Sequence, residues 1–128
     1  MTVNDLYKLT KAWMFEKNTS TIYDNYILPI TNKVLAEVAE ENNMARMFRG
    51  LRPLESIPQV TSLNDDLTDM GIMEEYQLEV IPKGVDANFL MDDDLNKMSL
   101  YQTEYNNARV KCQKMVSQER IEEILNAI

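Results

Sequence analysis

One run of residues constrains the fold of this chain more than any other. Apolar side chains between residues 95 and 115 recur every three or four positions, which is the spacing that places them on one face of an α-helix. They are Leu95, Met98, Tyr101, Tyr105, Ala108, Cys112 and Met115. We therefore expect a long helix whose apolar face packs against the second and third helices of a bundle.

The first half of the chain has the same helical periodicity. Thr2 and Asp5 stand at the spacing of a capping box, which predicts a first helix that runs to about Phe15. A second helix is predicted over residues 24–42. It contains Pro29, which a helix tolerates only in its first turn or at a kink.

The middle of the chain is less regular. Pro53 and Pro58 interrupt residues 44–72, so we expect a packed connector there with at most a short strand or helical turn. A helical pattern resumes over residues 73–91, and Pro82 should kink it or divide it. The predicted fold class is mainly α. It is a single domain, residues 1–128, in which four to five helices form a small bundle with an irregular Pro-containing connector and a C-terminal tail.

Composition argues against most catalytic chemistry. The 128 residues include no histidine, three glycines and one cysteine. Histidine is the commonest general base and metal ligand, and glycine-rich loops are needed to cradle phosphates. Cys112 lies on the apolar stripe and is expected to be a buried hydrophobe rather than a nucleophile. We therefore expect no enzyme activity, no catalytic residue and no cofactor.

The strongest metal candidate is the acidic run at residues 92–94. Asp92, Asp94 and Asn96 alternate as in the opening of a calcium-binding EF-hand loop, but Lys97 takes the position that needs glycine. The N-terminus of a helix explains the same acids with fewer assumptions. The sequence thus predicts a helix N-cap and no metal site.

Nothing in the sequence predicts a membrane span or a secretory leader. No apolar stretch approaches the roughly 18 residues of a transmembrane helix. The first residues lack the basic and apolar regions of a signal peptide. We expect a soluble protein from a reducing compartment, with no membrane partner.

Charge is unevenly distributed along the chain. The net charge is −8, residues 65–94 contain ten acids and Lys83, and residues 95–116 contain four basic residues and Glu104. This balance disfavours sequence-specific nucleic-acid binding. The two segments can pair within one chain or between copies, or they can be two differently solvated faces. The candidate contact residues are Asp65, Asp66, Asp69, Lys111 and Lys114.

The end of the chain, residues 117–128, is unusually apolar for a terminus. Four large apolar side chains follow one another at spacings of three, one and three: Ile121, Ile124, Leu125 and Ile128. Chain ends are usually polar and frayed unless something holds them. The segment either folds back onto its own bundle or docks on another subunit, and these four residues are the candidate partner-binding set.

Several segments resemble the small head-tail connector proteins of tailed bacteriophages. They are residues 57–63 (IPQVTSL), 80–87 (VIPKGVDA), 89–93 (FLMDD) and 28–37 (LPITNKVLAE), together with Tyr101 and Tyr105 in the long helix. The resemblance covers about residues 22–125. Its motifs are hydrophobic and turn signatures rather than catalytic ones.

This resemblance implies a structural virion protein. Connectors of this kind are helical adaptors that assemble as a ring, typically twelvefold, below the portal and dock the next tail or stopper protein. The implied partners are therefore the portal, that tail component and further copies of the chain. The implied location is the head-tail interface of the virion, with host cytoplasm during assembly. The alternative function is a small acidic helical regulator that binds a basic protein through residues 65–94.

Overall fold

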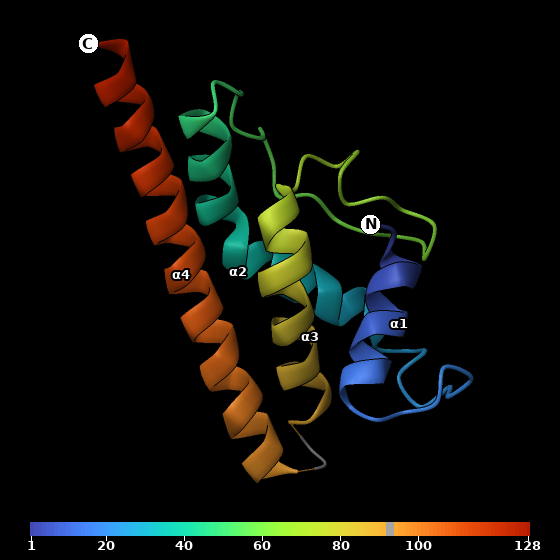
Figure 1. The fold of residues 1–128 in the computed structure, drawn as a ribbon. Helices are drawn as coiled ribbons and strands as arrows, with labels where there is room; N and C mark the ends of the chain where they lie inside the picture. Colours follow the sequence, from blue (N-terminus) through green and yellow to red (C-terminus); the bar gives the residue numbers. More distant parts are fainter. Residues whose placement is uncertain (92–93) are drawn as a thin grey trace.

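Helices account for most of the described chain, residues 1–91 and 94–128, in this computed structural model (Figure 1). The elements are α1 (Val3–Trp13), α2 (Ile27–Phe48), the π-helical turn η1 (Tyr76–Val80), α3 (Ile81–Phe89) and α4 (Leu95–Ala127). Among the described residues no strand forms, and one isolated bridge joins Thr2 to Asp66. The mainly helical class and the small bundle are therefore confirmed.

The shortest α-helix, α3, is the centre of the bundle. It packs against α1, α2 and α4, and seven of its nine residues are buried. At Gly84 a Cβ atom would stand 2.8 Å from the Tyr105 ring of α4 and 3.0 Å from Val34 of α2. Both distances are shorter than ordinary contact. Glycine at this position therefore lets three helices approach one another closely.

Pro82 does not divide the helix as expected, and a π-helical turn stands directly before it. Helical structure runs from residue 74 to residue 89, and the N–H of Ile81 donates to the carbonyl of Tyr76, five residues back. Proline has no N–H with which to continue the α-helical ladder. A widened turn just before Pro82 accommodates the missing donor without ending the helix.

The helix starts in the first half agree with the sequence better than the helix ends. The capping box is present: Asp5 N–H donates to Thr2 Oγ1 at 3.1 Å, and Thr2 N–H donates to Asp5 Oδ2 at 3.2 Å. The first helix ends at Trp13, two residues before Phe15, whose φ is +61°. The second helix begins and ends later than predicted, so Pro29 lies in its first turn.

The irregular connector is held by asparagine side chains of α2. Asn32 accepts from the N–H of Val60 and donates to its carbonyl, at 2.7 and 3.0 Å. Asn42 donates to the carbonyl of Gly71, and Asn43 accepts from the N–H of Leu54. These amides provide the pairing that a neighbouring strand would otherwise give to exposed backbone groups.

The predicted apolar face of α4 is only partly correct. Tyr105, Ala108 and Cys112 are buried, but Leu95 and Met115 are exposed, and Val116 takes the last buried position. The buried set follows spacings of three, four and four, which keeps it on one side of a helix with 3.6 residues per turn.

The N-terminus of α4 is capped as predicted by one of the three acids. Asp94 accepts hydrogen bonds from the N–H groups of Asn96 and Lys97, both at 3.1 Å. Asp92 and Asp93 lie outside the described residues, so the calcium alternative stays a sequence-level argument. The acid at the helix start satisfies backbone donors that have no partner within the helix.

Candidate docking site

The helix α4 carries two apolar faces on opposite sides. Successive residues turn by about 100° around a helix axis, so Tyr105, Ala108 and Val116 fall within roughly 40° of Cys112. The four apolar residues of the C-terminal segment fall roughly 120–220° away from Cys112. They are exposed, at 57% for Ile121, 48% for Ile124, 63% for Leu125 and 97% for Ile128. We call these four residues the outer stripe.

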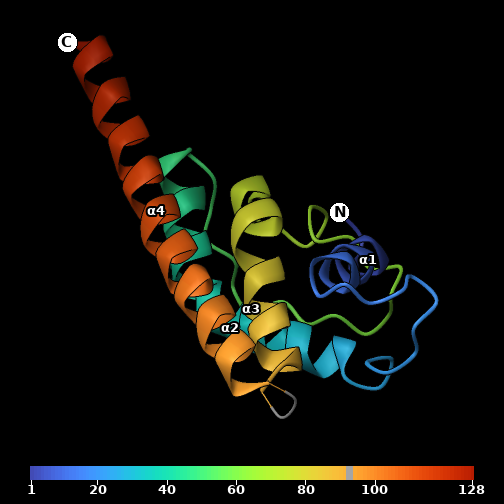
Figure 2. The same ribbon diagram turned by 60° about the horizontal axis from the view of Figure 1, so that its bottom comes forward.

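The outer stripe lies on a part of α4 that projects from the bundle. All residues from 117 to 128 are exposed, and the end of α4 extends past the other helices in both views (Figure 1, Figure 2). The segment is a direct continuation of α4 and not a separate tail. Folding back onto the bundle, one of the two sequence-based alternatives, is therefore wrong.

One arginine fixes α4 where it leaves the bundle. Arg49, just after α2, forms ion pairs with Glu75 and, at 2.8 Å, with Glu119. The hydrogen bond to Glu119 is the largest cause of a raised pKa at Arg49. This bridge holds the first turn of the projecting segment in place and leaves the outer stripe pointing away from the bundle.

The predicted acidic contact residues lie in a turn beside α1. The Asp65 carboxylate accepts from the N–H groups of Thr61 and Ser62, at 2.7 and 3.1 Å, and these bonds lower its pKa. Asp66 accepts from the Thr68 N–H, which lowers its pKa, and lies 3.6 Å from the N-terminal amine. Asp69 is exposed. Two of the three acids thus hold the local backbone.

The predicted basic contact residues, Lys111 and Lys114, are exposed on α4. Lys111 lines a cavity of about 400 Å³ with Glu79 and Glu104, although neither lysine forms an ion pair within the described residues. The third basic residue of this part of α4, Arg109, pairs with Glu41 of α2 at 2.9 Å. Pairing within the chain therefore joins α4 to α2 here.

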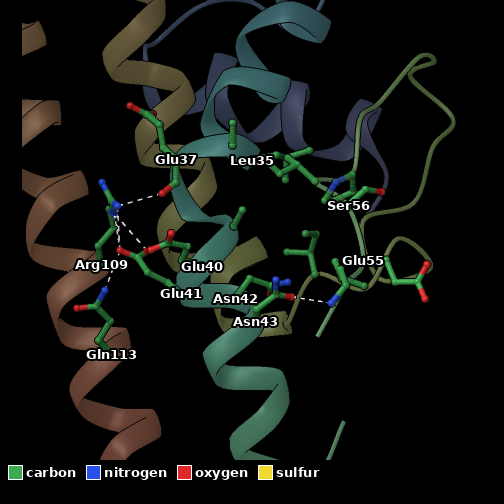
Figure 3. A pocket seen from close by; sticks show the side chains of 16 residues that line it. Leu35, Glu37, Glu40, Glu41, Asn42, Asn43, Glu55, Ser56, Arg109 and Gln113 are labelled. Carbon is green, nitrogen blue, oxygen red and sulfur yellow. Dashed lines mark hydrogen bonds and ion pairs between the residues drawn. The ribbon is translucent and has the colours of Figure 1, made fainter. Parts of the chain in front are cut away.

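A larger cavity lies between α2, the connector and α4, and Figure 3 shows its lining. Its volume is about 490 Å³. We call it the acidic groove because four carboxylates and one cation line it: Glu37, Glu40, Glu41, Glu55 and Arg109. The remaining lining is mainly aliphatic, with Leu35, Ala36, Ala39, Leu54, Ile57, Pro58 and Ile72.

The single cation of the acidic groove, Arg109, is paired within the chain. Arg109 Nε donates to both carboxylate oxygens of Glu41, at 2.9 and 3.2 Å, and its Nη2 donates to the Glu37 carbonyl at 3.1 Å. Gln113 also donates to Glu41 at 2.8 Å. Glu40 and Glu55 are exposed and form no ion pair or hydrogen bond with any described residue. The groove therefore presents unneutralised negative charge.

One buried acid was not recognised as a candidate from the sequence. Asp86 of α3 is fully buried, and neither carboxylate oxygen has a hydrogen-bond partner among the described residues. Burial, with a smaller contribution from Glu104, raises the pKa of Asp86 to about 8. The sequence indicated that Asp86 could be buried, because it stands between the apolar residues Val85 and Ala87 in the helical pattern of residues 80–91.

Two further observations bear on chemistry and membranes. Burial raises the pKa of the Cys112 thiol, which disfavours the reactive thiolate. Across residues 1–91 and 94–128, no cluster of three metal-ligating side chains is found and no helix is both long and apolar enough to cross a bilayer.

Comparisons with protein-family models, with curated proteins and with solved structures found no match to this chain. The functional argument therefore depends on the surfaces described above and on the sequence motifs.

Proposed function

We propose that this protein is a structural adaptor that assembles as a ring, as a head-tail connector of a tailed bacteriophage does. The observation that carries the proposal is the outer stripe, a row of four exposed apolar side chains. It lies on the end of α4 that projects from the bundle (Figure 2). Large exposed apolar surfaces on soluble proteins mark interaction sites. The connector-like segments of the sequence support the same function.

In this proposal the projecting end of α4 docks on a neighbouring subunit or on the portal. Burying three or four such side chains contributes roughly 5–10 kcal/mol before ordering costs. The part of those costs that comes from ordering the backbone is small here, because the segment is already helical before it docks. The ring, typically twelvefold, then binds the next tail or stopper protein, at the head-tail interface of the virion after assembly in host cytoplasm.

The alternative, a small acidic regulator that binds a basic protein through residues 65–94, has less support. Asp65 and Asp66 accept hydrogen bonds from their own turn, and Glu75 pairs with Arg49. These acids already have partners within the chain, so they are less available to bind a basic protein. Light scattering distinguishes the two functions, because a regulator stays monomeric at high concentration until its partner is added.

The test replaces two residues of the outer stripe. Ile121→Ser with Leu125→Ser should keep the melting temperature and far-UV helicity of the dilute, monomeric parent. It should abolish rings in negative-stain microscopy and large species in light scattering at the concentrations at which the parent assembles. The control is Phe15→Ser with Ile22→Ser, which removes two exposed apolar side chains elsewhere. Unchanged assembly of the outer-stripe variant, or a monomeric parent protein at every concentration and on portal, would refute the proposal.

A further inference from the structure

The polar and charged side chains of α4 lie on both sides of its buried face, which is centred on Cys112. Measured around the helix from Cys112, Arg109 and Gln113 lie roughly 60° and 100° to one side, where they line the acidic groove. Lys111 and Lys114 lie roughly 100° and 160° to the other side. The acidic groove and this pair of lysines therefore face in different directions from one molecule.

The acidic groove has the chemistry to hold lysine side chains. Glu40 and Glu55 lack partners among the described residues, and the aliphatic lining offers a surface for a long apolar stem. A lysine side chain combines such a stem with a terminal cation. Figure 3 shows Glu40 and Glu41 on the α4 side of the groove and Glu55 at the connector side. The two sides can thus contact two neighbouring cations.

We propose that the acidic groove of one copy receives Lys111 and Lys114 of a second copy, so that copies join head to tail. A contact between two different surfaces of identical chains is heterologous, and it forms a ring when the rotation between copies closes. This inference rests on the proposed ring assembly and adds a second, charged contact between copies to the apolar contact made by the outer stripe. The acidic partner is then the α2 groove, and not residues 65–94 as the charge distribution along the sequence suggested.

Such a contact predicts a dependence on salt. Exposed charges are screened over roughly 8–10 Å at physiological ionic strength, so head-to-tail association should weaken steadily as salt is added. An interface made only by the apolar outer stripe would strengthen or stay constant. Sedimentation velocity at low and high salt distinguishes these two results.

The decisive experiment reverses each surface and then mixes the variants. Lys111→Glu with Lys114→Glu makes both surfaces of a copy acidic, and Glu40→Lys with Glu55→Lys makes both basic. Each variant alone should associate roughly a hundredfold more weakly than the parent, because like charges then face each other. An equimolar mixture should assemble again, because each surface meets its opposite in the other variant.

The control is Lys8→Glu with Lys17→Glu, which makes the same change in net charge at two exposed lysines elsewhere. It should assemble like the parent, and at a protein concentration low enough to keep the parent monomeric all variants should have the parental melting temperature. Parental assembly of both reversed variants, or a mixture that stays dissociated, overturns the proposed contact while ring assembly itself stands. A parent that never self-associates overturns both.

Discussion

The two halves of α4 carry similar apolar side chains in opposite environments. In residues 95–116 the side chains of Tyr105, Ala108, Cys112 and Val116 are buried against the bundle, whereas in residues 117–128 the outer stripe faces solvent. Helical periodicity is present in both halves. The comparison teaches that periodicity predicts a helix and an apolar face but does not predict what covers that face.

The largest loss of stability is expected when a charge is introduced into the inner half of α4, residues 95–116, which packs against the bundle. Tyr105 is 1% exposed and its hydroxyl donates to Glu37 at 3.2 Å. Tyr105→Asp buries a carboxylate and leaves the space of an aromatic ring, so we expect it to lower the free energy of unfolding by about 3–5 kcal/mol. Thermal melting measures the effect.

The matched control for this substitution is Thr103→Asp, two residues away on the exposed side of the same helix. It should leave the melting temperature close to that of the parent. Equal melting temperatures for the two variants would show that the inner face of α4 does not form the core.

The second prediction concerns Asp86 of α3. Burial and the charge of Asp86 raise the pKa of Tyr101 in the inner half of α4, and burial and Glu104 raise the pKa of Asp86 itself. Burial raises its pKa to about 8, from 3.8 in an unfolded chain. The folded protein therefore keeps a proton that the unfolded chain releases. This group lowers the free energy of unfolding as the pH rises from about 4 to about 8, by roughly 1.4 kcal/mol per pH unit.

Asp86→Asn removes this titration and keeps the shape of the side chain. The variant should be more stable than the parent at pH 8, by about 3 kcal/mol once the cost of an unpaired buried amide is included, and should lose that advantage near pH 4. Urea unfolding of both proteins across this range measures the difference, so that other titrating groups cancel. Parallel stability profiles would show that Asp86 titrates as it does in the unfolded chain.

Local signals in the sequence were sufficient for much of the fold. The capping box of Thr2 and Asp5 and the early position of Pro29 involve only neighbours along the chain, and both are present. The buried positions Tyr105, Ala108 and Cys112 were also predicted, because one regular stripe of α4 faces the rest of the bundle. The helix ends were less accurate, since they depend on packing as much as on propensity.

The direction of the outer stripe was available in the sequence but was not used. Ile121 follows Val116 after five residues, a step that turns by roughly 140° around a helix. In a regular helix the apolar residues of the C-terminal segment therefore lie on a different side from the core face. The predicted separate tail at residues 117–128 did not include this change in the side of the helix on which the apolar residues lie.

The acidic groove could not be predicted from local pattern. Its lining includes Glu41, Glu55 and Arg109, which come from two helices and the connector. Each of the three is a charged residue, and nothing in its local sequence indicates that it lines a cavity. Only the packing of α4 on α2 brings them together, and that packing depends on contacts far apart along the chain.

The smallest expected change in stability is for a substitution in the exposed end of α4, and it is compared with one in the buried part of the same helix. Val116 is 4% exposed and Ile124, two turns further along α4, is 48% exposed. Val116→Ala should lower the free energy of unfolding by about 1–3 kcal/mol, because it removes buried methyl groups. Ile124→Ala should change it by no more than about 0.5 kcal/mol, because a surface substitution in a helix leaves no cavity.

Urea unfolding at low protein concentration measures both variants, since association would stabilise the folded state by mass action. Repeating the measurement at higher protein concentration then distinguishes the variants by how much assembly stabilises them. The parent and Val116→Ala should gain stability as they assemble, and Ile124→Ala should gain less, because its contact with a second subunit is weakened. A loss at Ile124 equal to that at Val116 in the dilute monomer would mean that the end of α4 packs within its own chain, and the two halves of the helix would then not differ.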